Sequence, residues 1–149
     1  MEYTTFGKTG RKVSRIGFGG AVAGLKNYLH EYDPSSDESI KSVVEAIEKA
    51  LDLGINYFDT APGYGEKMFG IALEGIEPEN IFLATKVSFG SYDDVMRSVE
   101  SSLKNLHRDR IDLLQIHGDS ITYDMAEAIL SDNGMLKAME KIKKAGVVK

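Results

Sequence analysis

The fold of this chain is decided by the stretch Asp59-Thr60-Ala61-Pro62-Gly63-Tyr64-Gly65. Residues 55–58 before it are mostly apolar, as in a strand, and residues 66–74 after it follow a helical pattern. The stretch therefore places a carboxylate and a phenol in a tight turn at the carboxyl end of a predicted strand. Ligands of α/β proteins bind at this end, because the loops there hold side chains above a rigid sheet.

Two further apolar segments end in a polar residue in the same way. Residues 81–86 end in Lys86, and residues 111–117 end in His117. Because the carboxyl ends of parallel strands meet at one edge of a sheet, we expect both side chains to lie near Asp59 and Tyr64. The sequence therefore predicts one candidate active site built from three successive strands.

The beginning of the chain indicates a small β-hairpin. Residues 3–10 and 11–19 are predicted as its two strands, with a turn at Lys8-Thr9-Gly10. The second strand runs on to Gly20, where successive glycines allow the backbone to approach a neighbour closely. Residues 21–33 then read as a loop.

Helix signals occupy the segments between the predicted strands. Ser35 opens a sequence with capping-box spacing, and the apolar residues within 40–51 then recur at helical intervals. Ser91 opens a second box of this kind before another amphipathic pattern. A last helix is predicted over residues 134–145, where most lysines lie on the outward face.

The resulting order is a hairpin followed by β-α-β-α-β-α-β-α, and residues 147–149 look like the approach to another strand. The central strands are almost continuously apolar, which is typical of a parallel sheet covered on both faces. A dinucleotide fingerprint of the G-x-G-x-x-G kind is missing after the first strand, which makes a Rossmann fold the weaker choice. We predict one α/β domain over residues 1–149.

The composition excludes several function classes. The net charge of -5, from 18 basic and 23 acidic residues, argues against nucleic acid as a partner. The chain has no cysteine, which removes disulfides, thiol catalysis and cysteine-bound metals together. No apolar run approaches the roughly 20 residues of a membrane span, and the N-terminus lacks signal-peptide features. A cytoplasmic protein is expected.

The four polar residues suit one kind of chemistry. A phenol is a weak acid near neutral pH, but a nearby ammonium stabilises its phenolate, and a carboxylate holds that ammonium in place. A neutral imidazole orients a carbonyl oxygen by hydrogen bonding. Such a set delivers a proton to a carbonyl oxygen as a hydride reaches its carbon. No side chain supplies a hydride, so we expect a nicotinamide cofactor to supply it. In this interpretation Tyr64 is the general acid, Lys86 tunes it, Asp59 pairs with Lys86, and His117 positions the substrate.

The four polar residues belong to motifs that resemble those of the aldo-keto reductases. The resemblance covers essentially the whole length of the chain. The resemblance implies a (β/α)8 barrel with an N-terminal hairpin, and reduction of aldehydes and ketones with NADPH, less often NADH. It implies that Asp59, Tyr64, Lys86 and His117 are catalytic, and that Gly20 and Ala21, with Asp59, contact the cofactor. The matching motifs are Phe6-Gly7-Lys8-Thr9-Gly10, Val13-Ser14-Arg15-Ile16-Gly17-Phe18-Gly19, Gly54-Ile55-Asn56-Tyr57-Phe58-Asp59-Thr60-Ala61-Pro62-Gly63-Tyr64-Gly65, Ala84-Thr85-Lys86-Val87 and Asp112-Leu113-Leu114-Gln115-Ile116-His117.

The chain departs from the family pattern in two ways. The link between Tyr64 and the following helix is shorter than in the family, so Tyr64 is expected to sit somewhat differently. In addition, a (β/α)8 barrel takes roughly 250 residues, whereas this chain has 149. It therefore provides about four of eight βα units, or half of a TIM barrel, and most of the family's cofactor contacts belong to the other half.

A half barrel leaves sheet edges unpaired and an inner face uncovered. We therefore interpret the chain as a fragment of a longer reductase, with self-association through the open half-barrel and independent folding as the other solutions. Two other functions stay open at this level. One is a non-catalytic binding or regulatory protein on the same scaffold. The other is a metal-dependent hydrolase using Asp59 and His117, against which the small number of histidines counts.

Overall fold

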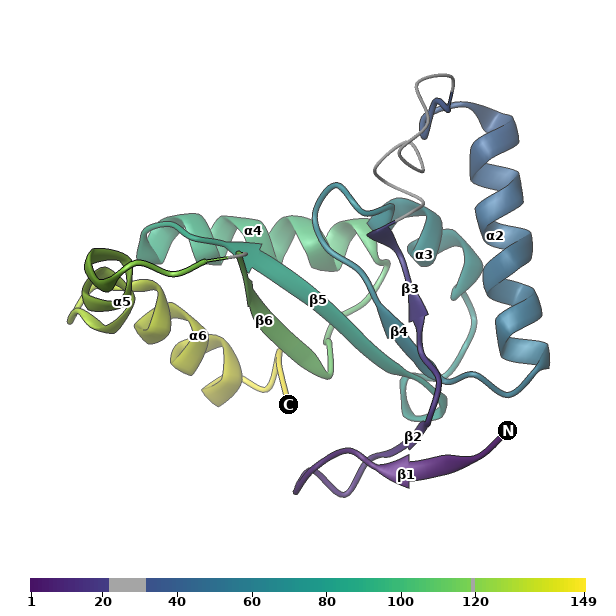
Figure 1. Cartoon of the computed structure of the whole chain (residues 1–149), viewed down its shortest axis with the longest axis horizontal. Coiled ribbons are helices and arrows are strands. Elements are labelled where there is room, and N and C mark those ends of the chain that lie inside the picture. Colours follow the sequence, from purple (N-terminus) through teal and green to yellow (C-terminus); the bar gives the residue numbers. More distant parts are fainter. Residues whose placement is uncertain (22–31, 119) are drawn as a thin grey trace.

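The computed structural model describes residues 1–21, 32–118 and 120–149, and most of the predicted loop at 21–33 lies outside these residues. Four parallel strands form the central sheet, and they lie side by side in sequence order (Figure 1). Sequential parallel strands of this kind are those of consecutive βα units in a barrel wall. The strands are β3 (Phe18–Gly19), β4 (Tyr57–Asp59), β5 (Phe82–Ser88) and β6 (Leu113–His117).

The register of this sheet decides which side chains share a face. Asp59 pairs with both Gly19 and Ala84, and Lys86 pairs with Gln115. Because successive residues of a strand point to opposite faces, Asp59 and Lys86 lie on the same side of the sheet. His117, two residues beyond Gln115, lies on that side as well.

Helices cover the opposite side of the sheet. Their apolar side chains form one core with residues from β4, β5 and β6, including Phe58, Leu83 and Leu114. The side that carries Asp59 and Lys86 is consequently the inner face of a half-barrel, as the sequence predicts. The helices are α2 (Asp37–Asp52), α3 (Glu66–Ala72), α4 (Tyr92–Asn105), α5 (Tyr123–Leu130) and α6 (Met135–Lys144), with a short 3-10 helix, η2 (Pro78–Asn80), before β5.

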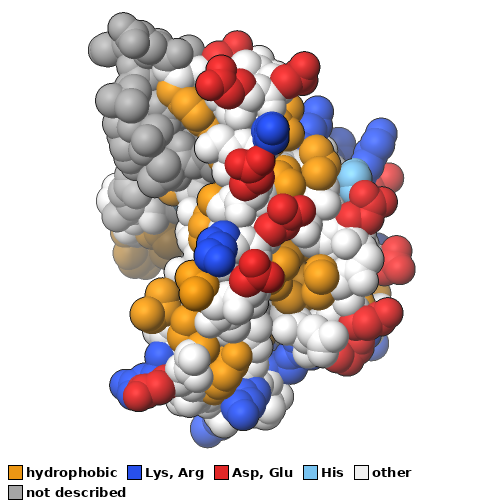
Figure 2. Space-filling view, turned by 90° about the vertical axis from the view of Figure 1, so that its right-hand side faces the viewer, with side chains coloured by type: hydrophobic (Ala, Val, Ile, Leu, Met, Phe, Trp, Pro, Cys, Tyr) orange, Lys and Arg blue, Asp and Glu red, His pale blue; other side chains and the backbone are white. Residues whose placement is uncertain are grey.

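The amphipathic pattern of α2 is confirmed, with Ile47 fully buried and Gly54 ending the helix in a left-handed conformation at φ 84°. Its capping residue differs from the prediction by one position. Ser36 is the N-cap and accepts from the amide of Ser39 at 3.2 Å. Ser35 instead donates its amide to the carboxylate of Asp33 at 2.9 Å, which makes it part of the preceding turn. The outer side of α2 belongs to a face on which acidic and basic side chains are interspersed (Figure 2).

The predicted second hairpin strand is divided in two. Strands β1 (Tyr3–Thr5) and β2 (Lys12–Ser14) form a separate antiparallel pair, whereas β3 belongs to the parallel sheet. The single strand predicted over residues 11–19 is therefore wrong. The physical reason is a bend after β2, where the hydroxyl of Ser14 donates to the carbonyl of Ile16 at 2.7 Å and interrupts the extended backbone.

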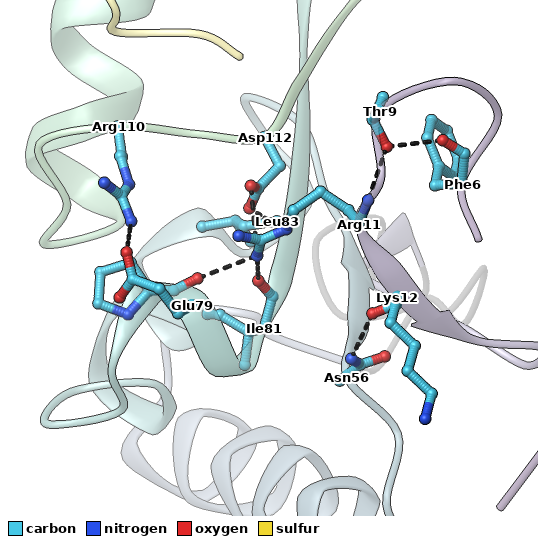
Figure 3. A network of polar contacts seen from close by, with 11 residues as sticks. Phe6, Thr9, Arg11, Lys12, Asn56, Glu79, Ile81, Leu83, Arg110 and Asp112 are labelled. Atoms are coloured by element: carbon cyan, nitrogen blue, oxygen red, sulfur yellow. Dashed lines mark hydrogen bonds and ion pairs between the residues drawn. The ribbon is translucent and has the colours of Figure 1, made fainter. Parts of the chain in front are cut away.

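The hairpin is fastened to the amino ends of the parallel strands. Phe6 packs against Phe82 with ring centroids 4.6 Å apart. Arg11 donates to the carbonyls of Ile81 and Pro78, and its guanidinium lies 3.4 Å from the carboxylate of Asp112 (Figure 3). These contacts close the lower end of the half-barrel and leave the upper end, at the carboxyl edge of the strands, for a site.

Later elements follow the sequence closely. The predicted capping box of α4 is present, with the side chain of Ser91 accepting from the amide of Asp94. Strand β5 continues two residues beyond Lys86 to Ser88, so Lys86 does not end it. The predicted approach to another strand is confirmed, because Val148 forms a parallel bridge with Ile111. Within the part of the chain that the structure describes, no helix is both long and apolar enough to cross a membrane.

Candidate active site

The turn between β4 and α3 carries the phenol of the site. Its backbone is closed by a hydrogen bond from the amide of Tyr64 to the carbonyl of Ala61 at 2.8 Å. Gly63 and Gly65 on either side of Tyr64 have φ values of 84° and 80°. This left-handed conformation disfavours residues with a Cβ atom, which explains the two glycines. Helix α3 begins directly after Gly65, and this accommodates the short link noted in the sequence.

An ion pair joins β4 to β5 beneath this turn. The ammonium of Lys86 donates to Oδ1 of Asp59 and, at 2.8 Å, to the backbone carbonyl of Thr60. The side chains of Lys86 and Asp59 are 15% and 34% exposed. Because both charges are partly withdrawn from water, each depends on the other more than the partners of a surface pair do.

The phenol of Tyr64 meets the imidazole of His117 above the ion pair. Tyr64 Oη lies 3.1 Å from His117 Nε2, and the two rings are nearly perpendicular, with an interplanar angle of 81°. The tautomer of His117 decides which of the two groups donates. The Nζ atom of Lys86 lies 5.8 Å from the centre of the Tyr64 ring. This places the positive charge of Lys86 beside the aromatic ring of Tyr64.

The structure thus brings all four predicted side chains together in one continuous arrangement. Asp59 contacts Lys86, Lys86 lies beside the ring of Tyr64, and Tyr64 contacts His117. The contact between Tyr64 and His117 joins residues 53 positions apart. It arises because β4, β5 and β6 are neighbours in the sheet and end at the same edge.

The structure gives Gly20 a position beneath the same turn. Its amide donates to the carbonyl of Asp59 at 2.8 Å, and the residue is buried. A Cβ atom at this position would lie 2.6 Å from the carbonyl oxygen of Tyr64 and 2.9 Å from Oγ1 of Thr60. Gly20 therefore permits the Tyr64 turn to settle onto the end of β3. Ala21, which follows it, is half-buried.

Three independent comparisons identify the family. The chain matches the Aldo/keto reductase family over residues 15–149. This chain belongs to the aldo-keto reductase family. It is 30% identical to L-galactose dehydrogenase of Arabidopsis thaliana, over 98% of this chain and 46% of that protein. It is 36% identical to aldo-keto reductase YhdN of Bacillus subtilis, over 78% of this chain and 38% of that protein.

A solved aldo-keto reductase has the same fold over nearly the whole chain. The holo form of AKR11C1 from Bacillus halodurans superimposes with a TM-score of 0.74 and 29% identity, covering 99% of this chain and 48% of that one. The chain therefore spans about half the length of the aldo-keto reductases it matches. This confirms the half-barrel predicted from the sequence.

Two polar residues that were not selected from the sequence support the candidate site from below. Thr60 is completely buried and bonded both to Tyr64 and to Lys86. Glu66 is only 3% exposed. Its carboxylate accepts a hydrogen bond from Thr85 at 2.7 Å and another from Asn105 at 3.2 Å. These bonds connect the start of α3 to β5 and α4. The only signal in the sequence was their position beside Asp59 and Tyr64, since neither belongs to a pattern that specifies burial.

Tyr57 carries a second phenol on the inner face of the half-barrel. Burial, reinforced by the negative charge of Asp59, raises the pKa of Tyr57 above its ordinary value. Tyr57 packs edge-to-face on Phe82, at the hairpin end of the barrel. The ring of Tyr57 therefore lies among aromatic side chains at that end, whereas the phenol of Tyr64 contacts His117 at the carboxyl end of the strands.

The donor set fits a nicotinamide cofactor, which aldo-keto reductases use, better than a metal ion. Asp59 and His117 are each engaged, the first by the ammonium of Lys86 and the second by Tyr64. Among residues 1–21, 32–118 and 120–149, no group of three or more His, Cys, Asp or Glu side chains is arranged to hold a metal. A phenol, an imidazole and an ammonium at one edge are groups that polarise and protonate a carbonyl oxygen.

Proposed function

We propose that this chain carries the proton-donating part of a carbonyl-reducing site, and that the whole protein is an NAD(P)H-dependent reductase of aldehydes or ketones. One observation supports this most directly. The phenol of Tyr64 lies 3.1 Å from the imidazole of His117 and beside an ammonium that is paired with Asp59. A packed structural tyrosine would not need a charged residue held beside its ring by a second charged residue.

In the proposed reaction Tyr64 is the general acid. Its O–H bond breaks, and the proton moves to the carbonyl oxygen, which becomes the hydroxyl of the alcohol product. Lys86, 5.8 Å from the ring centre, stabilises the phenolate that remains, and Asp59 keeps the ammonium there. His117 hydrogen-bonds the same carbonyl oxygen and orients it for the transfer.

NADPH is the proposed cofactor, with NADH as the alternative, and when bound it supplies the hydride that reaches the carbonyl carbon. Within this chain, Gly20, Ala21 and Asp59 are the residues proposed to contact it. Asp59 and Ala21 are both only half-buried at the carboxyl edge of the sheet, which leaves part of each side chain for a ligand. In this proposal, these three residues bind the cofactor and orient it.

Further properties belong to the same proposal. Residues 1–149 form one domain, the substrate is a small carbonyl compound rather than a nucleic acid, and the protein acts in the cytoplasm. The exposed edges of a four-stranded half-barrel favour self-association unless further chain covers them. Gel filtration of the 149-residue chain over a range of concentrations tests this last point.

A fluorescence titration of NADPH with the purified 149-residue chain tests the proposal. Saturable binding followed by reduction of an aldehyde supports it, and Tyr64→Phe then abolishes reduction while retaining cofactor binding. Tyr57→Phe is the matched control, because it removes the hydroxyl of the inner-face phenol at the hairpin end of the barrel and should leave reduction unchanged. If NADPH does not bind at millimolar concentration, the chain carries the catalytic side chains of a reductase without a cofactor site, and the enzyme assignment holds only for a longer parent protein.

A further inference from the structure

Thr60 uses every polar group it has to connect the residues of the candidate site. Its hydroxyl donates to the backbone carbonyl of Tyr64 at 2.9 Å. Its own backbone carbonyl accepts from the ammonium of Lys86 at 2.8 Å, and its amide donates to the carbonyl of Ala84 at 2.9 Å. The residue is completely buried, so water does not compete for any of these bonds.

From this arrangement we propose that Thr60 is a positioning residue, which couples the location of the Lys86 ammonium to that of the Tyr64 phenol. Lys86 is held by the rigid strand β5, and its bond to Thr60 locates the end of β4. The hydroxyl of Thr60 then locates the backbone of Tyr64. The inference rests on the proposed function, since it describes how the proposed acid and the residue that tunes it are kept in register.

The turn needs such a link because its own backbone is permissive. Gly63 and Gly65 flank Tyr64, and glycine accesses more backbone conformations than any other residue. The N-cap of α3, Gly65, has no side-chain cap. If Tyr64 moved away, the buried hydroxyl of Thr60 would lose its acceptor, and an unsatisfied buried hydroxyl is unfavourable. The hydroxyl therefore opposes displacement of Tyr64 Oη from His117.

Substitutions at position 60 separate the hydroxyl from the packing. Thr60→Val keeps the shape of the side chain and the backbone carbonyl that binds Lys86, and removes only the bond to Tyr64. Thr60→Ser keeps the hydroxyl and removes the methyl group. Thr60→Ala and Thr60→Ser form a second pair that differs only in the hydroxyl oxygen, which is useful if Thr60→Val does not fold.

The readout is the ring nitrogen resonance of His117 in the ¹⁵N-labelled 149-residue chain, at fixed pH. The chain has three histidines, and the signal of His117 is assigned by its loss in His117→Asn. Tyr64→Phe defines the position of this resonance when the phenol hydroxyl is absent. We expect Thr60→Val to shift it most of the way to that position, and Thr60→Ser to leave it near that of the wild type.

The results that overturn the inference are equally defined. An unchanged His117 resonance in Thr60→Val, when Tyr64→Phe shifts it, shows that the hydroxyl does not position Tyr64. An equal shift in Thr60→Ser and Thr60→Val shows that any change of this side chain disturbs Tyr64, and that the hydroxyl has no specific positioning role. If Thr60→Val and Thr60→Ala both fail to fold while Thr60→Ser folds, the hydroxyl has a general structural role and the specific coupling is rejected.

This measurement does not depend on turnover. A positive NMR result with no carbonyl reduction would leave the positioning role intact and reject the reductase function of the isolated chain. Where reduction is observed, Thr60→Val should lower kcat about tenfold, the effect of losing one net hydrogen bond. The KM for the carbonyl substrate should change much less, because Thr60 is buried below the site.

Discussion

The backbone of Gly20 packs so closely against Tyr64 that a Cβ atom at position 20 would lie 2.6 Å from the Tyr64 carbonyl oxygen. This contact places the end of β3 directly beneath the turn that carries the proposed acid. The family resemblance implies that Gly20 contacts the cofactor. The packing against Tyr64 is a second reason for a glycine at this position.

We expect Gly20→Ala to destabilise the chain by about 1–3 kcal/mol, the usual effect of forcing an extra carbon into a packed interior. Gly19→Ala is the matched control, because a Cβ atom at Gly19 would meet nothing within 4 Å. Urea unfolding of both variants measures the difference. Equal stability of the two alanine variants would show that the turn yields to the methyl group without loss of free energy.

The ion pair between Asp59 and Lys86 should be energetically coupled. Both side chains are partly buried, at 34% and 15% exposure. In a double-mutant cycle of Asp59→Asn and Lys86→Met, we expect a coupling free energy of about 1–2 kcal/mol. The reference is the ion pair Lys41–Glu45 on α2, whose charged atoms lie 3.8 Å apart and whose side chains are 77% and 62% exposed. Its coupling free energy should be less than about 0.5 kcal/mol. Similar coupling in the two cycles would contradict a special role for the buried geometry.

Arg11 should contribute far more to stability than other arginines of the hairpin region. The side chain of Arg11 is 19% exposed, and that of Asp112 is 8% exposed. The guanidinium of Arg11 contacts two backbone carbonyls and the carboxylate of Asp112 (Figure 3). We expect Arg11→Met to lower the free energy of unfolding by about 2–4 kcal/mol, because it leaves a mostly buried carboxylate without its cation.

Arg15→Met is the control for this substitution. Arg15 pairs with Glu2, but the two side chains are 64% and 81% exposed, so the loss should stay within about 0.5 kcal/mol. Denaturant unfolding monitored by circular dichroism measures both. A loss of similar size at the two positions would mean that the contacts of Arg11 add little beyond a surface charge.

The capping box of α4 predicts a pH-dependent contribution to stability. Two hydrogen bonds from Ser91 lower the pKa of Asp94 below its ordinary value. The larger effect comes from the Ser91 hydroxyl and the smaller one from its amide. A carboxyl with a lowered pKa in the folded state stabilises that state above its unfolded pKa of about 3.9, and the contribution is lost as the pH falls through the lower, folded value.

Asp94→Asn should therefore lower the melting temperature at pH 7 and have almost no effect near roughly pH 2, where the wild-type carboxyl is neutral too. Asp93→Asn is the control, because this exposed neighbour is not part of the capping box. Thermal unfolding at several pH values measures the effect. An effect of Asp94→Asn that is as large at pH 2 as at pH 7 would mean that the charge of Asp94 does not contribute.

Features that depend on a few neighbouring residues were predictable from the sequence. The amphipathic face of α2, the cap at Ser91 and the βα order of the chain follow from local spacing. Local signals also misled in two places. The helix cap was predicted one residue too early, at Ser35, because the amide of Ser35 is bonded to the carboxylate of Asp33. The strand predicted over residues 11–19 is interrupted where the hydroxyl of Ser14 donates to the carbonyl of Ile16.

The sequence by itself determined the fold class, the family and the four polar residues of the candidate site, because strand patterns and motifs are read from consecutive residues. Only the tertiary structure decided that the phenol of Tyr64 meets His117, and that Thr60 connects it to Lys86. Those contacts depend on the register between parallel strands and on the close approach at Gly20. Strand register joins segments that lie far apart in the sequence, and it depends on which side chains the packed sheet buries.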